Sequence, residues 1–128
     1  LPIPTPALDL GSGIRAAADL VVLPEAERPS AVFAANDLLA IGLLQGLVTA
    51  GLRVPEDVAI IGYDDIDFAA AAAVPLSSVR QPRTALGETA ARLLLEEIAS
   101  QDEGQPHEHR SERFVPELVV RRSTARRV

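Results

Sequence analysis

The sequence predicts an α/β domain with a mostly parallel sheet flanked by helices. Short apolar runs bounded by turn residues alternate along the chain with segments of helical periodicity. The expected order is helix and strand repeated four times, which favours parallel strands joined by helical crossovers. With 128 residues, of which 48% are hydrophobic, the chain is long enough for one such domain or for a piece of a larger one.

The first segments of the chain are expected to form a loop and a helix. Residues 1–12 are rich in proline, which predicts a leading loop with a short edge strand near residues 3–8. Apolar residues at helical spacing follow over residues 13–23, and Ser12 or Gly13 is the expected cap of this helix.

The next segment, AVFAANDLLAIG, joins two apolar runs through an Asn-Asp pair. Residues 31–35 are typical of a parallel strand that is covered on both faces. Asp37 is the expected N-cap of a helix over residues 38–50. Gly42 and Gly46 lie one turn apart on this helix and leave a flat strip that another backbone can approach closely.

The second half of the chain repeats the pattern. We expect strands at residues 58–62, 77–81 and 113–121, and helices at residues 66–73 and 83–100. Pro116 lies inside the last expected strand and lacks a backbone N–H, so it predicts an edge position or a bulge for that strand.

Composition and charge narrow the possible environments and partners. The net charge of −6 and the pI of about 4.8 argue against nucleic-acid binding by this chain, because an acidic surface repels phosphates. The arginines at 121, 122, 126 and 127 are expected to form only a charged tail. The chain has no cysteine and no apolar run of the roughly 18 residues that a membrane span needs. A cytoplasmic protein is expected, with a processed extracellular protein as the alternative.

The absence of methionine, even at position 1, indicates that the chain does not begin where translation begins.

Polar pairs follow two of the expected strands and suggest a ligand site. Asn36 and Asp37 follow the strand at residues 31–35, and Asp64 and Asp65 follow the strand at residues 58–62. Parallel sheets bind ligands beyond the carboxyl ends of their strands. Amides and carboxylates suit hydroxyl groups, so a polyol, sugar or nucleoside is expected. The alternative is that Asp37 caps a helix and that Asp64 and Asp65 only begin a turn.

Other clusters give weaker indications of chemistry. Asp64, Asp65 and Asp67 could hold Mg²⁺ or form a phosphoacceptor site, although such a cluster is more often a solvated loop. His107 and His109 lack a third ligand nearby. The sequence contains no nucleophile elbow and no glycine-rich phosphate loop. We therefore expect a binding protein without metal, cofactor or catalytic activity.

Several motifs in order resemble the LacI/GalR family of bacterial transcription regulators. They are PSAVFAANDLLAIG, VPEDVAIIGYDD, PLSSVRQP, LGETAARLLLEEI and LVVRRST. The resemblance implies a periplasmic-binding-protein-like type I fold, of which residues 1–128 form a truncated C-terminal subdomain for effector binding and dimerisation. It further implies two α/β subdomains that clamp a sugar or nucleoside effector. Operator DNA would be bound only by a helix-turn-helix that precedes this chain.

The resemblance also assigns expected roles to particular residues. Asn36 and Asp64 occupy positions that commonly hold the effector, and Gln81 lies at a crossover between subdomains. The family implies a homodimer, in which the glycine strip has a possible use. The helix at residues 83–100 normally belongs to the missing N-terminal subdomain. Its apolar stripe of Leu86, Leu93, Leu94 and Ile98 is therefore expected to pack on another chain or fold back on this one.

Two other classes of protein are weighed against this assignment. A periplasmic sugar-binding protein of a transport system shares the fold. A phosphotransfer receiver or metal hydrolase would need a nucleophile or phosphate loop that the sequence lacks.

Overall fold

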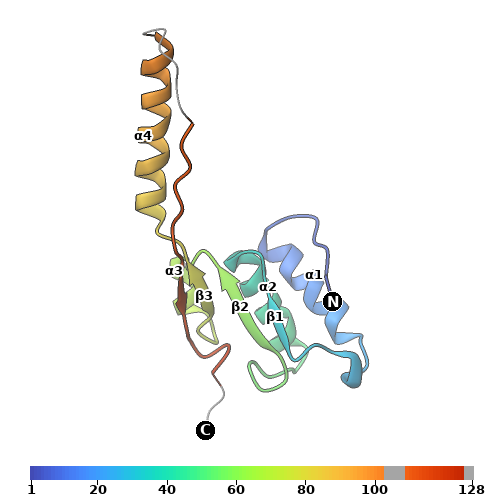
Figure 1. The fold of residues 1–128 in the computed structure, drawn as a ribbon. Helices are drawn as coiled ribbons and strands as arrows, with labels where there is room; N and C mark the ends of the chain where they lie inside the picture. Colours follow the sequence, from blue (N-terminus) through green and yellow to red (C-terminus); the bar gives the residue numbers. More distant parts are fainter. Residues whose placement is uncertain (103–108, 126–128) are drawn as a thin grey trace. The chain divides into compact units, whose positions relative to one another are not determined.

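The computed structural model describes residues 1–102 and 109–125, and it confirms the predicted mostly parallel sheet. Its strands lie side by side in chain order: β1 (Ala31–Phe33), β2 (Ala59–Tyr63), β3 (Ser77–Arg80) and β4 (Glu117–Val119) (Figure 1). The first three strands are parallel, and β4 pairs antiparallel with β3. β4 is an edge strand, as the proline just before it predicted.

The chain forms two compact units. The first unit comprises Leu1–Arg80 and Glu117–Val128, and the second comprises Gln81–Pro116. The first contains the sheet together with helices α1 (Leu10–Val21), α2 (Asp37–Thr49) and α3 (Asp67–Ala71) and a short 3₁₀ helix at Glu25–Glu27. The second contains α4 (Arg83–Asp102).

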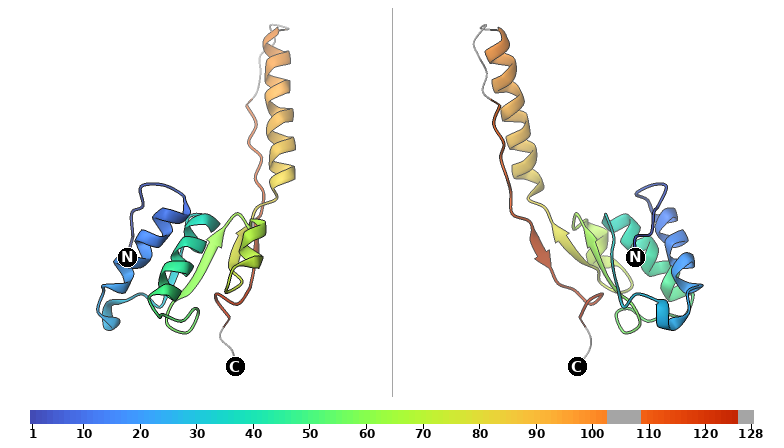
Figure 2. Two further views of the ribbon diagram at one scale, coloured as in Figure 1. Left: turned by 180° about the vertical axis from the view of Figure 1, so that it is seen from behind. Right: turned by 45° about the vertical axis from the view of Figure 1, so that its right-hand side comes forward.

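The core of the first unit lies on one face of the sheet. Leu20 and Leu47, from α1 and α2, are fully buried in the same cluster as Ile60 of β2. Burial of side chains of this size contributes roughly 1.5–3 kcal/mol each. Figures 1 and 2 show α1 and α2 side by side.

The other face of the sheet is largely open, so the prediction that β1 is covered on both faces is wrong. The burial of β2 alternates along the strand, with Ile60 and Gly62 buried and Ile61 and Tyr63 only partly buried. Phe33 of β1 is 61% exposed. The sequence of this short strand is continuously apolar, and such a run does not show which of its faces is covered.

The start of α1 also differs from the prediction. The helix begins at Leu10, and its N-cap is Asp9, whose carboxylate accepts a hydrogen bond of 2.7 Å from the backbone N–H of Ser12. Ser12 and Gly13 therefore lie inside the first turns of the helix. Residues 3–8 form no strand.

The glycine strip of α2 has a purpose within the chain. A Cβ atom at Gly42 would clash with the backbone carbonyl of Leu10, and one at Gly46 would clash with the side chain of Ala17. Gly13 of α1 meets α2 in the same way, at the backbone of Leu39. The close approach that the glycines predicted is thus made by α1 of the same chain, and the suggested use in dimerisation is not supported.

In the second unit, α4 carries exposed apolar side chains. Leu94, Leu95 and Ile98 are 59%, 66% and 47% exposed, so the alternative in which the stripe folds back on the chain is wrong for Leu94 and Ile98. Packing against another chain stays a prediction. Arg92 and Glu96 form an ion pair one turn apart, at 3.1 Å.

None of the helices in the described part of the chain is long and apolar enough to cross a membrane.

Candidate functional site

The two polar pairs lie at the same edge of the sheet, where the parallel strands β1 and β2 end. Asn36 and Asp37 follow β1, and Asp64 and Asp65 follow β2 directly. Both pairs belong to the first unit. The structure therefore brings together the two segments that the sequence singled out for a ligand.

Asn36, and not Asp37, caps α2, so the prediction that Asp37 is the N-cap is wrong. The Oδ1 atom of Asn36 accepts from the backbone N–H of Leu39 at 2.9 Å, and its Nδ2 donates to the carbonyl of Leu8 at 3.0 Å. An N-cap residue needs an extended backbone, which Asn36 has with φ −152° and ψ 171°. Asp37 is already the first residue of the helix, so its side chain is available for other contacts.

Asp37 is fully buried and points into the sheet. Its Oδ2 accepts from the backbone N–H of Ile66 at 2.8 Å, and its Oδ1 accepts from the hydroxyl of Ser78 at 2.6 Å. A Cβ atom at Gly62 would clash with this carboxylate, so the glycine provides the space that it occupies. Burial raises the pKa of Asp37 above 3.8, although the hydrogen bonds from Ser78 and Ile66 act in the opposite direction.

Asp64 and Asp65 have an unusual backbone conformation. Both have positive φ angles, 106° and 51°, and they are the only residues other than glycine in the described part of the chain with this feature. Such conformations cost about 1–3 kcal/mol each and concentrate at functional sites. The backbone N–H of Asp64 donates to the carbonyl of Val79 at 2.9 Å, and Asp64 itself is half-buried.

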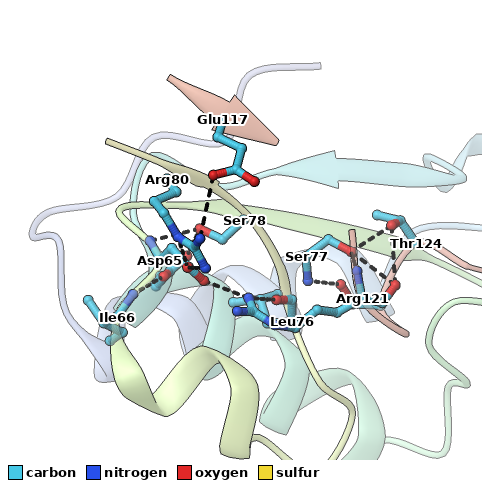
Figure 3. Close-up of polar contacts among 11 residues, drawn as sticks. Asp65, Ile66, Leu76, Ser77, Ser78, Arg80, Glu117, Arg121 and Thr124 are labelled. Atoms are coloured by element: carbon cyan, nitrogen blue, oxygen red, sulfur yellow. Dashed lines mark hydrogen bonds and ion pairs between the residues drawn. The ribbon is translucent and has the colours of Figure 1, made fainter. Parts of the chain in front are cut away.

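Asp65 is a buried partner of two arginines, and not part of a solvated loop. Arg121 donates to its Oδ1 at 2.6 Å, and Arg80 donates to its Oδ2 at 2.7 Å (Figure 3). The carboxylate is only 5% exposed, and the side chain of Arg121 is 18% exposed. Burial alone would raise the pKa of Asp65, but the hydrogen bonds and charges of Arg121 and Arg80 lower it below 3.8.

The ion pairs extend to β4. Arg80 also contacts the carboxylate of Glu117 at 3.5 Å (Figure 3). Arg80 is the last residue of the first unit before the chain enters the second, and Glu117 is the first residue after the chain returns. The ion pairs therefore join the turn after β2 to the two strands at which the chain leaves and re-enters this unit.

The prediction that Arg121 belongs only to a charged tail is wrong. Besides Asp65, the guanidinium of Arg121 donates to the carbonyl of Leu76 at 2.8 Å. Ser123 follows and is fully buried, where its hydroxyl donates to the carbonyl of Ile60 at 2.6 Å and accepts from the backbone N–H of Ser77 at 2.8 Å. The segment RRST is thus bound to the sheet. Arg126 and Arg127 lie outside the described residues.

An aromatic pair that was not predicted from the sequence lies beside the polar edge. The rings of Phe33 and Tyr63 meet edge to face, with centroids 6.5 Å apart and planes at 79°. Phe33 pairs with Ile61 in the sheet register, so Tyr63 is its diagonal neighbour on the open face. Aromatic residues make up only 3% of the sequence, and Phe33 and Tyr63 both lie near the end of an expected strand. Their positions were the signal in the sequence for this contact.

The remaining candidates do not join this group. Gln81 is the first residue of the second unit, so only Asn36 and Asp64 of the three predicted ligand residues lie in one unit. His107 lies outside the described residues, and His109 is 82% exposed. Over the described ranges, no group of three or more histidine or acidic residues is arranged to hold a metal ion.

Comparison with known proteins identifies the type of fold and site. A family model described as a periplasmic binding protein-like domain matches residues 3–124. The transcriptional repressor PurR of Aliivibrio fischeri (strain ATCC 700601 / ES114) is 38% identical over 120 residues, which cover 94% of this chain and 34% of that protein. PurR of Haemophilus influenzae (strain PittEE) is 43% identical over 102 residues, which cover 80% of this chain and 30% of that protein.

Solved structures agree with these relatives. A LacI-family regulator from Enterococcus faecalis V583 with bound ribose has a TM-score of 0.80 and 36% identity, over 96% of this chain and 43% of that one. A LacI-family regulator from Lactobacillus casei with bound sucrose has a TM-score of 0.75 and 31% identity, over 91% of this chain and 41% of that one.

The chain therefore belongs to the family of periplasmic binding protein-like domains, and within it to the effector-binding portion of LacI-family transcriptional regulators. The predicted resemblance and fold class are confirmed. The prediction of a chain without catalytic activity is also confirmed, because the relatives are transcriptional repressors. The chain spans about a third of the length of the curated relatives that it matches.

Proposed function

We propose that this chain senses a small sugar or nucleoside for a bacterial LacI-type regulator. Asn36, Asp64 and Phe33 form its share of the effector site. The observation that carries the proposal is the strained backbone of Asp64 at the carboxyl edge of a parallel sheet, where this class of fold binds ligands. The bound ribose and sucrose of the similar regulators support a sugar.

The residues of this edge suit a hydroxylated ring. The exposed face of Phe33 offers an apolar surface for the ring, and ligand sites usually combine such surface with a few polar groups. The Asn36 carboxamide is held by its two hydrogen bonds, and each of its polar atoms has capacity for one more. Asp64 would accept hydrogen bonds from ligand hydroxyls.

The regulator would act through parts of the polypeptide outside this chain. We propose that effector binding changes the affinity of a homodimer for operator DNA, which is bound by a helix-turn-helix, as the names of the similar repressors suggest. A cytoplasmic location follows from this role. A periplasmic transport protein shares the family model, but the repressors among the relatives favour the regulator.

The test is isothermal titration calorimetry of ribose, glucose, sucrose, adenosine and guanosine into the full polypeptide in which the chain occurs. At least one of them should bind, and Asp64→Ala should weaken that binding by about tenfold or more. Asn36→Ser should weaken it less while it keeps the helix cap, because serine is also a good N-cap. If neither substitution changes the affinity of the ligand that binds best, the effector site is elsewhere.

A further inference from the structure

The turn that contains Asp64 is hydrogen-bonded to the side chain of Asp37, which follows the neighbouring strand β1. We propose that Asp37 is a positioning residue for effector recognition: its buried carboxylate fixes the backbone of residues 64–66 and thereby sets where Asp64 meets the ligand. This inference rests on the proposed role of Asp64. It assigns to the second residue of the Asn-Asp pair a task that neither capping nor ligand contact describes.

Three consecutive backbone N–H groups of the turn are fixed, and two of them depend on Asp37. The N–H of Ile66 donates directly to Asp37 at 2.8 Å. The N–H of Asp65 donates at 3.0 Å to the hydroxyl of Ser78, which in turn donates to Asp37 at 2.6 Å. The N–H of Asp64 donates to Val79 in β3. Asp37 thus orients both residues that follow Asp64.

The turn needs this support because of its own conformation. Asp64 and Asp65 both have positive φ angles, which residues other than glycine rarely adopt. A turn of this kind keeps its shape only while the surrounding structure holds it. Without the acceptor at position 37, the N–H of Ile66 would lose its partner, and the strained residues before it could relax.

Asp37 cannot take part in recognition by touching the ligand. Its side chain is fully buried, and its two oxygens already accept hydrogen bonds from Ile66 and Ser78. The carboxylate also lies against Gly62, where a Cβ atom would clash with it. Any effect of Asp37 on the effector must therefore pass through the turn.

The hydrogen-bond partners of Asp37 indicate that it positions the turn more than it stabilises the fold. The two donors are a hydroxyl and a backbone amide, and among the described residues no arginine or lysine forms an ion pair with the carboxylate. A buried carboxylate without a cation is a costly way to stabilise a core. It is, however, a strong acceptor that can hold two donors in fixed directions.

The experiment compares three variants of the full polypeptide with the wild type. Asp37→Ala removes the acceptor, Asp64→Ala removes the proposed ligand contact, and Leu47→Ala is the control for lost stability. Leu47 is fully buried at the other end of α2, so it destabilises the same helix without touching the turn. Effector affinity is measured by calorimetry at a temperature where circular dichroism shows every variant to be folded.

Asp37→Ala should weaken effector binding by about tenfold or more, a loss similar to that of Asp64→Ala. The affinity of Leu47→Ala should stay within about threefold of the wild-type value. Amide exchange at Ile66, followed by NMR, should accelerate in Asp37→Ala and stay slow in Leu47→Ala. Asp37→Asn, which keeps an acceptor for Ile66, should restore most of the affinity. If Asp37→Ala does not fold, Ser78→Ala is used instead. It removes one of the two hydrogen bonds to Asp37 and should weaken effector binding to a smaller extent.

The outcomes separate this inference from the proposed function. If Asp64→Ala loses affinity and Asp37→Ala does not, Asp37 is only a structural residue and the inference is wrong. Equal losses in Asp37→Ala and Leu47→Ala lead to the same conclusion, because general destabilisation then explains both. If no sugar or nucleoside binds, or if Asp64→Ala binds as the wild type does, the proposed function itself fails, and the inference fails with it.

Discussion

The Asn-Asp pair after β1 and the Asp-Asp pair after β2 place their residues in the same way but stabilise them differently. In each pair the first residue is half-buried at the edge of the sheet and the second is buried, with Asp37 at 0% and Asp65 at 7% exposure. Asp37 is held by a hydroxyl and a backbone amide, and its pKa is raised. Asp65 is held by two guanidinium groups, and its pKa is lowered.

The difference shows that burial alone does not decide the charge behaviour of an acid. Both carboxylates lose solvation, but in the described part of the chain Asp65 has cations within hydrogen-bond distance and Asp37 has none. Asp65 therefore ties distant segments together through strong ion pairs. Asp37 fixes the local direction of a turn at some cost in stability. The following predictions test this contrast, beginning with the largest expected effect.

The largest effect is expected from Asp65→Ala. Removal of the carboxylate leaves Arg121 mostly buried without its charged partner, and breaking a buried pair in this way costs about 3–5 kcal/mol. The free energy of unfolding, measured by urea titration, should fall by that amount. Arg53→Ala is the control, because it breaks the ion pair from its exposed side, 71% accessible, while Asp57 keeps its hydrogen bond from the backbone N–H of residue 53, so the urea midpoint should stay nearly unchanged. Similar midpoints for both variants would contradict the structural role of Asp65.

A smaller loss is expected from Gly62→Ala. The added methyl group would clash with the carboxylate of Asp37 and crowd the side chain of Leu76, and such overpacking costs roughly 1–3 kcal/mol. Gly87→Ala in α4 is the matched control, because a Cβ atom there meets nothing within 4 Å. Urea titration should show a clear loss for the first variant and none for the second, since alanine favours a helix over glycine.

Asn36→Ala should cost about 1 kcal/mol, the usual effect of losing an N-cap. Asn36→Ser, which can cap the helix, should lose only a few tenths of a kcal/mol. The two variants can be compared by thermal unfolding monitored by circular dichroism. Equal stability of Asn36→Ala and the wild type would mean that Asp37 can serve as the cap after all.

The smallest effect is a difference in pH dependence. The raised pKa of Asp37 means that its contribution to stability is present below pH 3.8 and is lost as the pH rises through its folded pKa. The lowered pKa of Asp65 means that its contribution is present above pH 3.8 and is lost as the pH falls through its folded pKa. The two acids should therefore act in opposite directions.

The measurement is a series of urea midpoints between about pH 3 and pH 7 for the wild type, Asp37→Asn and Asp65→Asn. Asp37→Asn should remove part of the decline toward neutral pH, and Asp65→Asn should remove part of the decline toward acid. Identical pH profiles for the two variants would show that the two carboxylates do not differ in the way described.

Much of the fold could be predicted from local patterns. Apolar runs, their spacing and the turn residues between them gave the order of helices and strands, and the polar pairs at two strand ends identified the edge where Asn36 and Asp64 lie. These features depend on neighbours in the sequence, and hydrophobic periodicity reports them directly. The motifs also contained the family resemblance, which the comparisons confirm.

Apart from the helix caps at Asp9 and Asn36, the errors concern contacts between residues far apart in the chain. The glycines of α2 predicted that another backbone approaches this helix closely, but only the fold shows that it is α1 of the same chain. Arg121 has the composition of a tail, and its pairing with Asp65, 56 residues earlier, cannot be read from its neighbours. Phe33 looked buried because its strand is short and wholly apolar.

The sequence by itself determined the class of fold, the family and the edge of the sheet where a ligand is expected. Only the tertiary structure decided which residue of each polar pair faces the edge and which is buried, that Asn36 caps α2, and that Asp37 holds the turn of Asp64. The physical reason is that a side chain's role depends on the donors and acceptors that surround it. For Asp37 and Asp65 these come from the turn after β2, from strand β3 and from the C-terminal segment, which only folding brings together.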